Sequence, residues 1–295
     1  MGLQQTVDAL EGRWGITAFV HAAEIGGDRE VGVRADDAVV AASVCKVPVL
    51  VEACSQVAAG EIDATRRVDL AADAFVVPGP TGISVFLDPV SLSFRDLCLS
   101  MMSVSDNRAT DVVIDAVGLD RVNATMRALE LPGTVLEGDC AALLGSLADD
   151  VGMPRDGDLD VATVDEDVLR AAAALDPART NRTTPRESTL LLDRIWTERG
   201  LAPAACTEAR RILGMQAWSH RLRAGFPDDG IRVSGKTGTL PTVRNEVGVV
   251  EDLASGRAWT VAVFLRLRST ASVVPSADRA IGEIAAAAVA ELRDA

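Results

Sequence analysis

The chain has 295 residues, a length that fits one large domain or two closely packed lobes. Hydrophobic residues make up 48% of it and charged residues 24%, an ordinary balance for a folded core. The net charge of −14 argues against nucleic acid and anionic membranes as partners, and it leaves a small-molecule substrate open.

The first sixty residues predict two helices separated by two strands. Apolar residues recur at helical spacing over residues 3–10, and residues 15–25 form a long run with strand character. The turn residues 26–28 then reverse the chain into a second strand at 29–33. Residues 44–59 follow with a mostly apolar helical pattern, so we expect a buried helix there.

Helical periodicity dominates the middle of the chain, and strand patterns return near its end. The predicted helices of the middle are residues 93–103, 109–117, 121–129, 141–147, 187–199 and 207–218. The predicted strands that follow are residues 233–238, 245–250 and 258–267, and a helix over 277–293 closes the chain. Residues 155–168 are acidic without periodicity, and we expect a loop there.

Strands at both ends and helices between them predict an α+β fold. The simplest arrangement is a three-layer α/β lobe, whose antiparallel sheet is built from both termini, with an all-α lobe inserted. Residues 1–40 and 200–295 would then form the α/β lobe, and residues 41–199 the helical lobe. The two lobes would form one closely packed unit.

Lysine is rare in this sequence. Of 29 basic residues only Lys46 and Lys236 are lysine. Two explanations stay open: a composition bias left these two by chance, or their chemical roles require an amine. Arginine keeps its proton in proteins, whereas a buried lysine can act as a base because desolvation lowers its pKa. Ser43 precedes Lys46 by three residues in an apolar run, so a helix would place hydroxyl and amine on one face. The pattern predicts a serine nucleophile activated by a lysine.

Three short motifs follow one another along the chain: Ser43-x-x-Lys46, Ser105-Asp106-Asn107 and Lys236-Thr237-Gly238. Each is weak alone, but together they resemble the signature of the penicillin-recognising serine hydrolases, the class A β-lactamases and penicillin-binding proteins. Similar segments also occur at residues 78–86, 92–109, 183–185 and 235–248, so the resemblance covers most of residues 15–290. It implies a β-lactamase/transpeptidase-like fold with the active site between the two lobes, in agreement with the order of the predicted elements.

The resemblance implies how the motif residues would form an acyl-enzyme. Ser43 would be the acylated nucleophile, and Lys46 its base or proton relay. Ser105 would pass a proton to the leaving nitrogen, assisted by the charge of Lys236. Two amines beside one hydroxyl would also lower each other's pKa.

The same resemblance implies the contacts with the substrate. Asn107 would hold a side-chain amide of the substrate, and Lys236 would help to bind a carboxylate. The stretch Thr237-Gly238-Thr239 would face the substrate. Backbone N–H groups of Ser43 and Thr239 would form the oxyanion hole, which a helix that starts near Ser43 would reinforce.

The chain departs from the class A pattern at the glutamate that activates the deacylating water. The family has Glu-x-x-Leu-Asn there, and this chain offers Glu166-Asp167-Val168-Leu169-Arg170. Arginine stands in the place of the asparagine, and the stretch from Glu166 to Pro185 is longer than in the family. Two interpretations stay open: Glu166 is the catalytic base, or it belongs to a solvated acidic loop.

The chain has two histidines and five cysteines, with no Cys-x-x-Cys pair. The cysteines are Cys45, Cys54, Cys98, Cys140 and Cys206. Many class A enzymes join the core helix to the position of Cys98 by a disulfide, but the partner position here is Leu50. We therefore expect buried free thiols, a reducing compartment, and no metal or other cofactor. No signal or membrane-spanning stretch is visible, which predicts a cytoplasmic protein, or a secreted one if a leader has been removed.

Three functions fit these observations. The leading hypothesis is a serine hydrolase acylated on Ser43, with β-lactam amides as its favoured substrates. The second is an esterase or peptidase-like relative that releases another acyl group slowly. The third is a non-catalytic protein that binds acyl ligands in the same pocket. In each case the partner is a small molecule, and the oligomeric state stays open.

Overall fold

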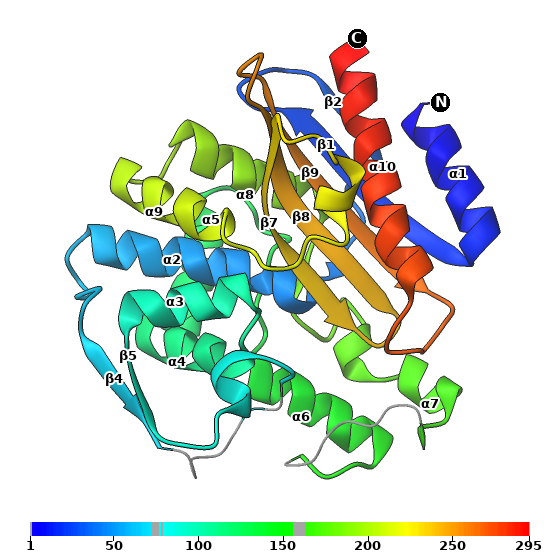
Figure 1. Ribbon diagram of the computed structural model, residues 1–295. Helices are drawn as coiled ribbons and strands as arrows, with labels where there is room; N and C mark the ends of the chain where they lie inside the picture. Colours follow the sequence, from blue (N-terminus) through cyan, green and yellow to red (C-terminus); the bar gives the residue numbers. More distant parts are fainter. Residues whose placement is uncertain (1, 72–76, 78, 156–162, 295) are drawn as a thin grey trace.

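A computed structural model describes residues 2–71, 77, 79–155 and 163–294 of the chain. Its central feature is an antiparallel sheet of five strands in the order β2-β1-β9-β8-β7. The strands are β1 (Ile16–Glu24), β2 (Glu30–Val33), β7 (Ile231–Leu240), β8 (Val243–Asp252) and β9 (Ala258–Leu267). Because β1 pairs with β9, the sheet joins both ends of the chain, and the predicted fold class is confirmed (Figure 1).

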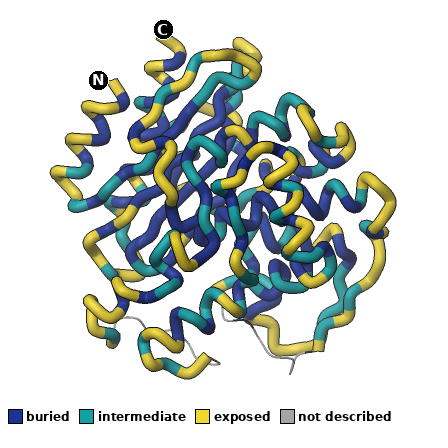
Figure 2. Tube along the Cα trace, turned by 180° about the vertical axis from the view of Figure 1, so that it is seen from behind, coloured by how far each residue is buried: buried dark blue, intermediate teal, exposed yellow. Residues whose placement is uncertain are grey.

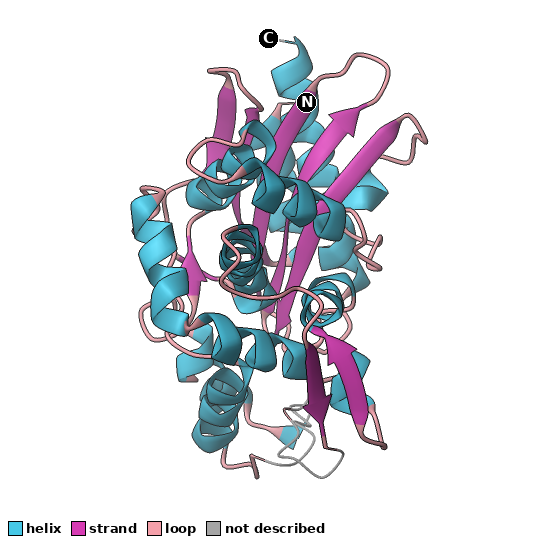
Figure 3. Cartoon of the chain, turned by 90° about the vertical axis from the view of Figure 1, so that its left-hand side faces the viewer, coloured by secondary structure: helices cyan, strands magenta, loops and turns pink. Residues whose placement is uncertain are grey.

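Helices cover both faces of this sheet. α1 (Leu3–Trp14) and α10 (Pro275–Asp294) pack on one face, and α8 (Pro185–Thr197) packs against β1 and β9 on the other (Figure 3). Neighbouring strand residues alternate between the two apolar cores, so that Val263 lies under α10 and Phe264 faces the helical side. The lobe boundaries remain a prediction; α8 lies within the span expected for the helical lobe and also forms a layer of the sheet.

α2 (Lys46–Ala58) is the central helix of the other half of the molecule. Every residue from Lys46 to Cys54 is buried, which confirms the buried helix that the apolar pattern predicted (Figure 2). The helices that contact α2 are α3 (Phe94–Ser103), α4 (Asn107–Val117), α5 (Leu119–Ala128) and α9 (Pro203–Leu213), and α6 (Cys140–Val151) packs on α4. No helix among the described residues is both long and apolar enough to cross a membrane.

Several short elements were not predicted. β3 (Val39–Val40) pairs with β6 (Arg182–Thr183), and β4 (Arg67–Leu70) pairs with β5 (Val90–Ser93). A five-residue helix, α7 (Glu166–Arg170), begins inside the span expected to be a loop, of which residues 156–162 lie outside the described residues. The side chain of Asp165 caps α7 by accepting the N–H groups of Asp167 and Val168, a local interaction that outweighs the missing periodicity.

Candidate active site

Ser43 lies in a tight turn that leads directly into α2. The turn is a 3-10 helix, Ala42–Cys45, and the N–H of Lys46 donates to the carbonyl of Ser43. The expectation that the α-helix starts near Ser43 is therefore corrected, because α2 begins three residues later, at Lys46. In a 3-10 helix side chains three residues apart eclipse each other, so the half-buried Ser43 side chain projects from the same side as that of Lys46.

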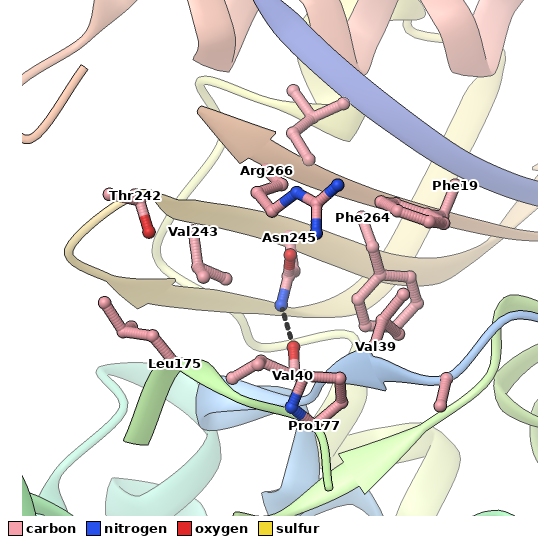
Figure 4. Close-up of a pocket in the computed structure, with 12 residues that line it drawn as sticks. Phe19, Val39, Val40, Leu175, Pro177, Thr242, Val243, Asn245, Phe264 and Arg266 are labelled. Atoms are coloured by element: carbon pink, nitrogen blue, oxygen red, sulfur yellow. Dashed lines mark hydrogen bonds between the residues drawn. The ribbon is translucent and has the colours of Figure 1, made fainter. Parts of the chain in front are cut away.

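The chain that leads into this turn is held from two sides. Asn245 of β8 donates its amide to the carbonyls of Val40, at 2.9 Å, and Ala41, at 3.2 Å (Figure 4). The N–H of Ala41 donates to the carbonyl of Asn181 at 2.9 Å. These bonds support Ala42, whose φ of +47° is uncommon for a residue with a side chain. The sheet thus fixes the backbone immediately before Ser43.

The close packing of Gly238 explains why the third motif contains a glycine. A Cβ at this position would lie 3.0 Å from the carbonyl oxygen of Ala41 and 3.3 Å from the Cβ of Ala42. A side chain here would therefore push β7 away from the turn that carries Ser43. The glycine lets the two motifs pack backbone against backbone.

The two lysines converge on one hydroxyl. Lys46 Nζ lies 3.2 Å from Ser105 Oγ, 2.8 Å from the Ser105 carbonyl oxygen and 2.9 Å from Asn107 Oδ1. Lys236 Nζ lies 3.0 Å from Ser105 Oγ and 2.8 Å from the carbonyl oxygen of Thr237. Both lysine side chains are fully buried. Residues from α2, the start of α4 and β7 thus meet at Ser105, although they are far apart in the sequence.

Burial and charge act together on the amine of Lys236. Burial, and then the charge of Lys46, lower the pKa of Lys236 well below its usual range. An amine of this kind loses its proton near neutral pH more readily than a solvated lysine. With Ser105 Oγ between the two amines, the group has the connections that a proton relay requires.

Asp106 holds Ser105 and Asn107 in place. Its carboxylate caps α4 by accepting the N–H of Ala109 at 3.1 Å, and it accepts the hydroxyl of Ser100 at 2.7 Å. It also accepts the N–H of Ile83 at 2.7 Å, which ties the preceding 3-10 helix (Gly82–Val85) to the motif. Ser105 has a φ of +64°, a strained conformation that this network stabilises.

The outer edge of β7 carries the predicted oxyanion donor. β7 is the last strand of the sheet, so half of its backbone groups point away from β8. At Thr237 these groups are bonded to side chains: the N–H donates to Gln216 Oε1 at 2.7 Å, and the carbonyl accepts from Lys236. Backbone groups repeat their direction at every second residue, so the N–H of Thr239 points outward too.

Arg221 and a cavity lie next to Thr239, and no sequence motif indicates either of them. Arg221 is buried and donates to Thr239 Oγ1 at 2.8 Å and to the Gly238 carbonyl at 2.9 Å, while Asp278 accepts from its Nε at 2.7 Å. Thr239 also lines a cavity of about 210 Å³. Its other lining residues are Leu144, Leu147, Leu240, Pro241, Arg244, Thr270 and Ser272.

Asp111 is a second feature that sequence reasoning missed. It lies one turn beyond Asn107 on α4 and accepts the N–H groups of Cys140, at 2.7 Å, and Ala141, at 2.9 Å. Burial raises the pKa of its carboxyl to about 6. Asp111 thereby fixes the start of α6 against the helix that carries Asn107. All five cysteines are buried with free thiols, as expected, and Cys140 is one of them.

Glu166 lies apart from the residues that meet at Ser105. Its side chain is 66% exposed, and its carboxylate accepts Arg170 at 3.2 Å and the hydroxyl of Thr270 at 3.5 Å. Arg170 in turn donates to the carbonyl of Leu267 at the end of β9, so α7 lies beyond that end of the sheet (Figure 1). The role of Glu166 as a base stays a prediction, and its observed partners fit the solvated-loop interpretation.

The sequence and the fold of this chain are similar to those of known proteins. The model of the β-lactamase enzyme family matches residues 2–292, so the chain belongs to that family. A solved β-lactamase from Sphaerobacter thermophilus is 28% identical, with a TM-score of 0.80 over 100% of this chain and 98% of that one. The penicillin-binding protein PBP-A shares the fold at 20% identity, with a TM-score of 0.77 over 99% of this chain and 96% of its own. The β-lactamase regulatory protein BlaB of Streptomyces cacaoi is 29% identical over 96% of this chain and 95% of its own.

Proposed function

We propose that this protein is a serine hydrolase that is acylated on Ser43 by β-lactam amides and releases the acyl group slowly. The observation that carries the proposal is the placement of two buried amines on Ser105 Oγ, one of them a single turn from Ser43. Desolvated amines are suited to accept and pass protons. The family of the chain supports the class of reaction.

In the proposed acylation, Ser43 Oγ attacks the lactam carbonyl while its proton passes to Lys46. The N–H groups of Ser43 and Thr239 stabilise the oxyanion. As the carbon–nitrogen bond breaks, Ser105 donates a proton to the leaving nitrogen and is reprotonated through the lysines. Asn107, Thr237 and Thr239 hold the polar groups of the substrate.

Slow release follows from the position of the expected base. Hydrolysis of the acyl-enzyme needs a carboxylate beside a water at the ester carbonyl. Glu166 is exposed and paired with Arg170 instead, at the end of the sheet where β9 finishes. A long-lived acyl-enzyme reports the presence of a β-lactam, a property that suits a sensor. The regulatory relative from Streptomyces cacaoi supports this extension.

Intact-mass spectrometry over time tests the proposal. The protein is incubated with benzylpenicillin and, separately, with an activated ester. We expect an adduct of the penicillin mass that persists after free penicillin is removed. A short-lived adduct with turnover would indicate an ordinary β-lactamase. Reaction with the ester alone would indicate an esterase, and no adduct with either would indicate non-covalent binding.

A further inference from the structure

A buried carboxylate lies directly behind the third motif. Glu246 of β8 is opposite Thr237 in the register of β7 and β8, and it is fully buried. Both of its oxygens accept hydrogen bonds, Oε1 from the Gln216 amide at 2.6 Å and Oε2 from the N–H of Leu222 at 2.7 Å. Two donors aimed at two oxygens match the ionised form of the side chain.

Gln216 connects this carboxylate to the edge of β7. It lies in the segment between α9 and the 3-10 helix Leu222–Gly225, which runs beside β7 (Figure 1). While its Nε2 donates to Glu246, its Oε1 accepts the N–H of Thr237 at 2.7 Å. The Thr237 carbonyl holds the Lys236 amine, which reaches Ser105 Oγ. Hydrogen bonds therefore connect Glu246 through Gln216 to the N–H of Thr237, and the carbonyl of the same residue through Lys236 to Ser105.

We infer that Glu246 and Gln216 are positioning residues for acylation, which fix the Lys236-Thr237 edge of β7 through their hydrogen bonds. The inference rests on the proposed acylation at Ser43. Neither residue belongs to the three motifs, and neither contacts Ser105 itself.

The electrostatic surroundings agree with this assignment. The charged groups that act on Glu246 are Arg221, which is paired with Asp278, and Lys236. Burial raises the pKa of the Glu246 carboxyl to about 7, and its charge opposes the lowering of the Lys236 pKa by burial and by Lys46. Protonation of Glu246 would relieve the cost of its buried charge, but it would also put an O–H against one of its two donors and weaken that hydrogen bond.

Lysine labelling tests the inference directly, because the chain has only two lysines. With ¹³C at the lysine ε-carbon, NMR resolves the titration of Lys46 and Lys236 in the free protein, and Lys46→Arg assigns the remaining signal to Lys236. In Glu246→Gln we expect Lys236 to titrate at lower pH than in the parent. The control Glu251→Gln changes a partly exposed carboxylate on the same strand and should leave this titration unchanged. An unchanged Lys236 titration in Glu246→Gln would overturn the inference.

Gln216→Met supplies a second variant, at a half-buried position, that keeps the length of the side chain and loses both hydrogen-bonding groups. We expect acylation by benzylpenicillin to slow by roughly tenfold to a hundredfold, as for other small misplacements of catalytic groups. Parental acylation rates in this variant would also overturn the positioning role. The titration of Lys236 is measured without substrate, so its result does not depend on whether the protein is acylated. A parent protein that forms no adduct would refute the proposed function alone.

Discussion

The two sides of the candidate active site, one proposed to carry out acylation and one expected to supply water, differ in burial. Lys46 and Lys236 are fully buried, and hydrogen bonds connect both to Ser105. Glu166 lies on a helix of five residues with two-thirds of its side chain exposed. Desolvation is what turns an ordinary amine or carboxylate into a catalytic group. The comparison therefore separates the buried amines, which we propose take part in acylation, from an exposed carboxylate whose role as a base stays a prediction.

The difference has a local cause. The groups at Ser105 come from α2, α4 and β7, whose positions are fixed by two large apolar cores. The position of Glu166 depends on the Asp165 side chain that caps α7 and on the exposed ion pair with Arg170. An exposed ion pair contributes only about 0.2–1 kcal/mol. The surroundings of Glu166 therefore fit the solvated-loop interpretation.

Removal of the nucleophile should have the largest effect. Ser43→Ala should abolish the covalent adduct with any acylating substrate, because Ser43 is the serine that lies three residues before Lys46, in the turn that leads into α2. The measurement is intact mass after incubation with benzylpenicillin. Ser55→Ala, on the same helix α2, is the matched control and should still form the adduct. Parental adduct formation by Ser43→Ala would place the nucleophile elsewhere.

A change of the first lysine should have the next largest effect. Lys46→Arg keeps a positive charge and removes the proton acceptor, so acylation should slow by roughly a hundredfold or more. Stopped-flow measurement of adduct formation gives the rate. A rate close to that of the parent would make Lys46 structural and would move the base to another residue.

The burial of Glu246 should also affect how the free energy of unfolding depends on pH. The folded-state pKa of Glu246 is raised to about 7, above its ordinary 4.5, so protonation favours the folded state. This stabilisation is complete below about pH 4.5 and is lost as the pH rises through 7. The free energy of unfolding should change by about 3 kcal/mol over this range. Urea denaturation of parent and Glu246→Gln between pH 4.5 and 8 measures it. The variant should show a flatter dependence, and parallel curves would contradict the buried titration.

Glu166 should give the smallest effect. Glu166→Gln should leave the deacylation rate within about twofold of the parent rate, a change of ~0.4 kcal/mol in the barrier, because the exposed carboxylate takes no part in the step that we propose. Arg170→Gln removes the other partner and serves as the matched comparison. Decay of the isolated adduct gives the rate. Accumulation of the acyl-enzyme in Glu166→Gln, with hydrolysis slowed by roughly 10²–10⁴, would assign Glu166 as the base.

The sequence was informative where chemistry and periodicity coincide. The sheet from both termini followed from apolar patterns at the two ends, and the buried α2 followed from its continuous apolar run. The lysines at Ser105 could be singled out because lysine is so rare in the chain. The apolar patterns are local signals that need only a short window of sequence, whereas the rarity of lysine is a property of the whole chain.

The remaining features depend on contacts between distant segments. Glu246 reads as an ordinary strand residue, and only the register of β7 and β8 brings it behind Thr237. Arg221 is one of many arginines, and its bond with Thr239 forms across 18 positions. The helix α7 was missed because five residues are too few to show a period. Such sites become visible only once the fold is known.

Burst kinetics with a chromogenic cephalosporin tests the central claim most directly, because one trace reports both acylation and release. The account predicts a rapid release of about one product per protein molecule, followed by a much slower steady state set by deacylation. The amplitude of the burst should scale with protein concentration. Rapid linear turnover without a burst would contradict the account, since it would require a working deacylation base in the parent protein.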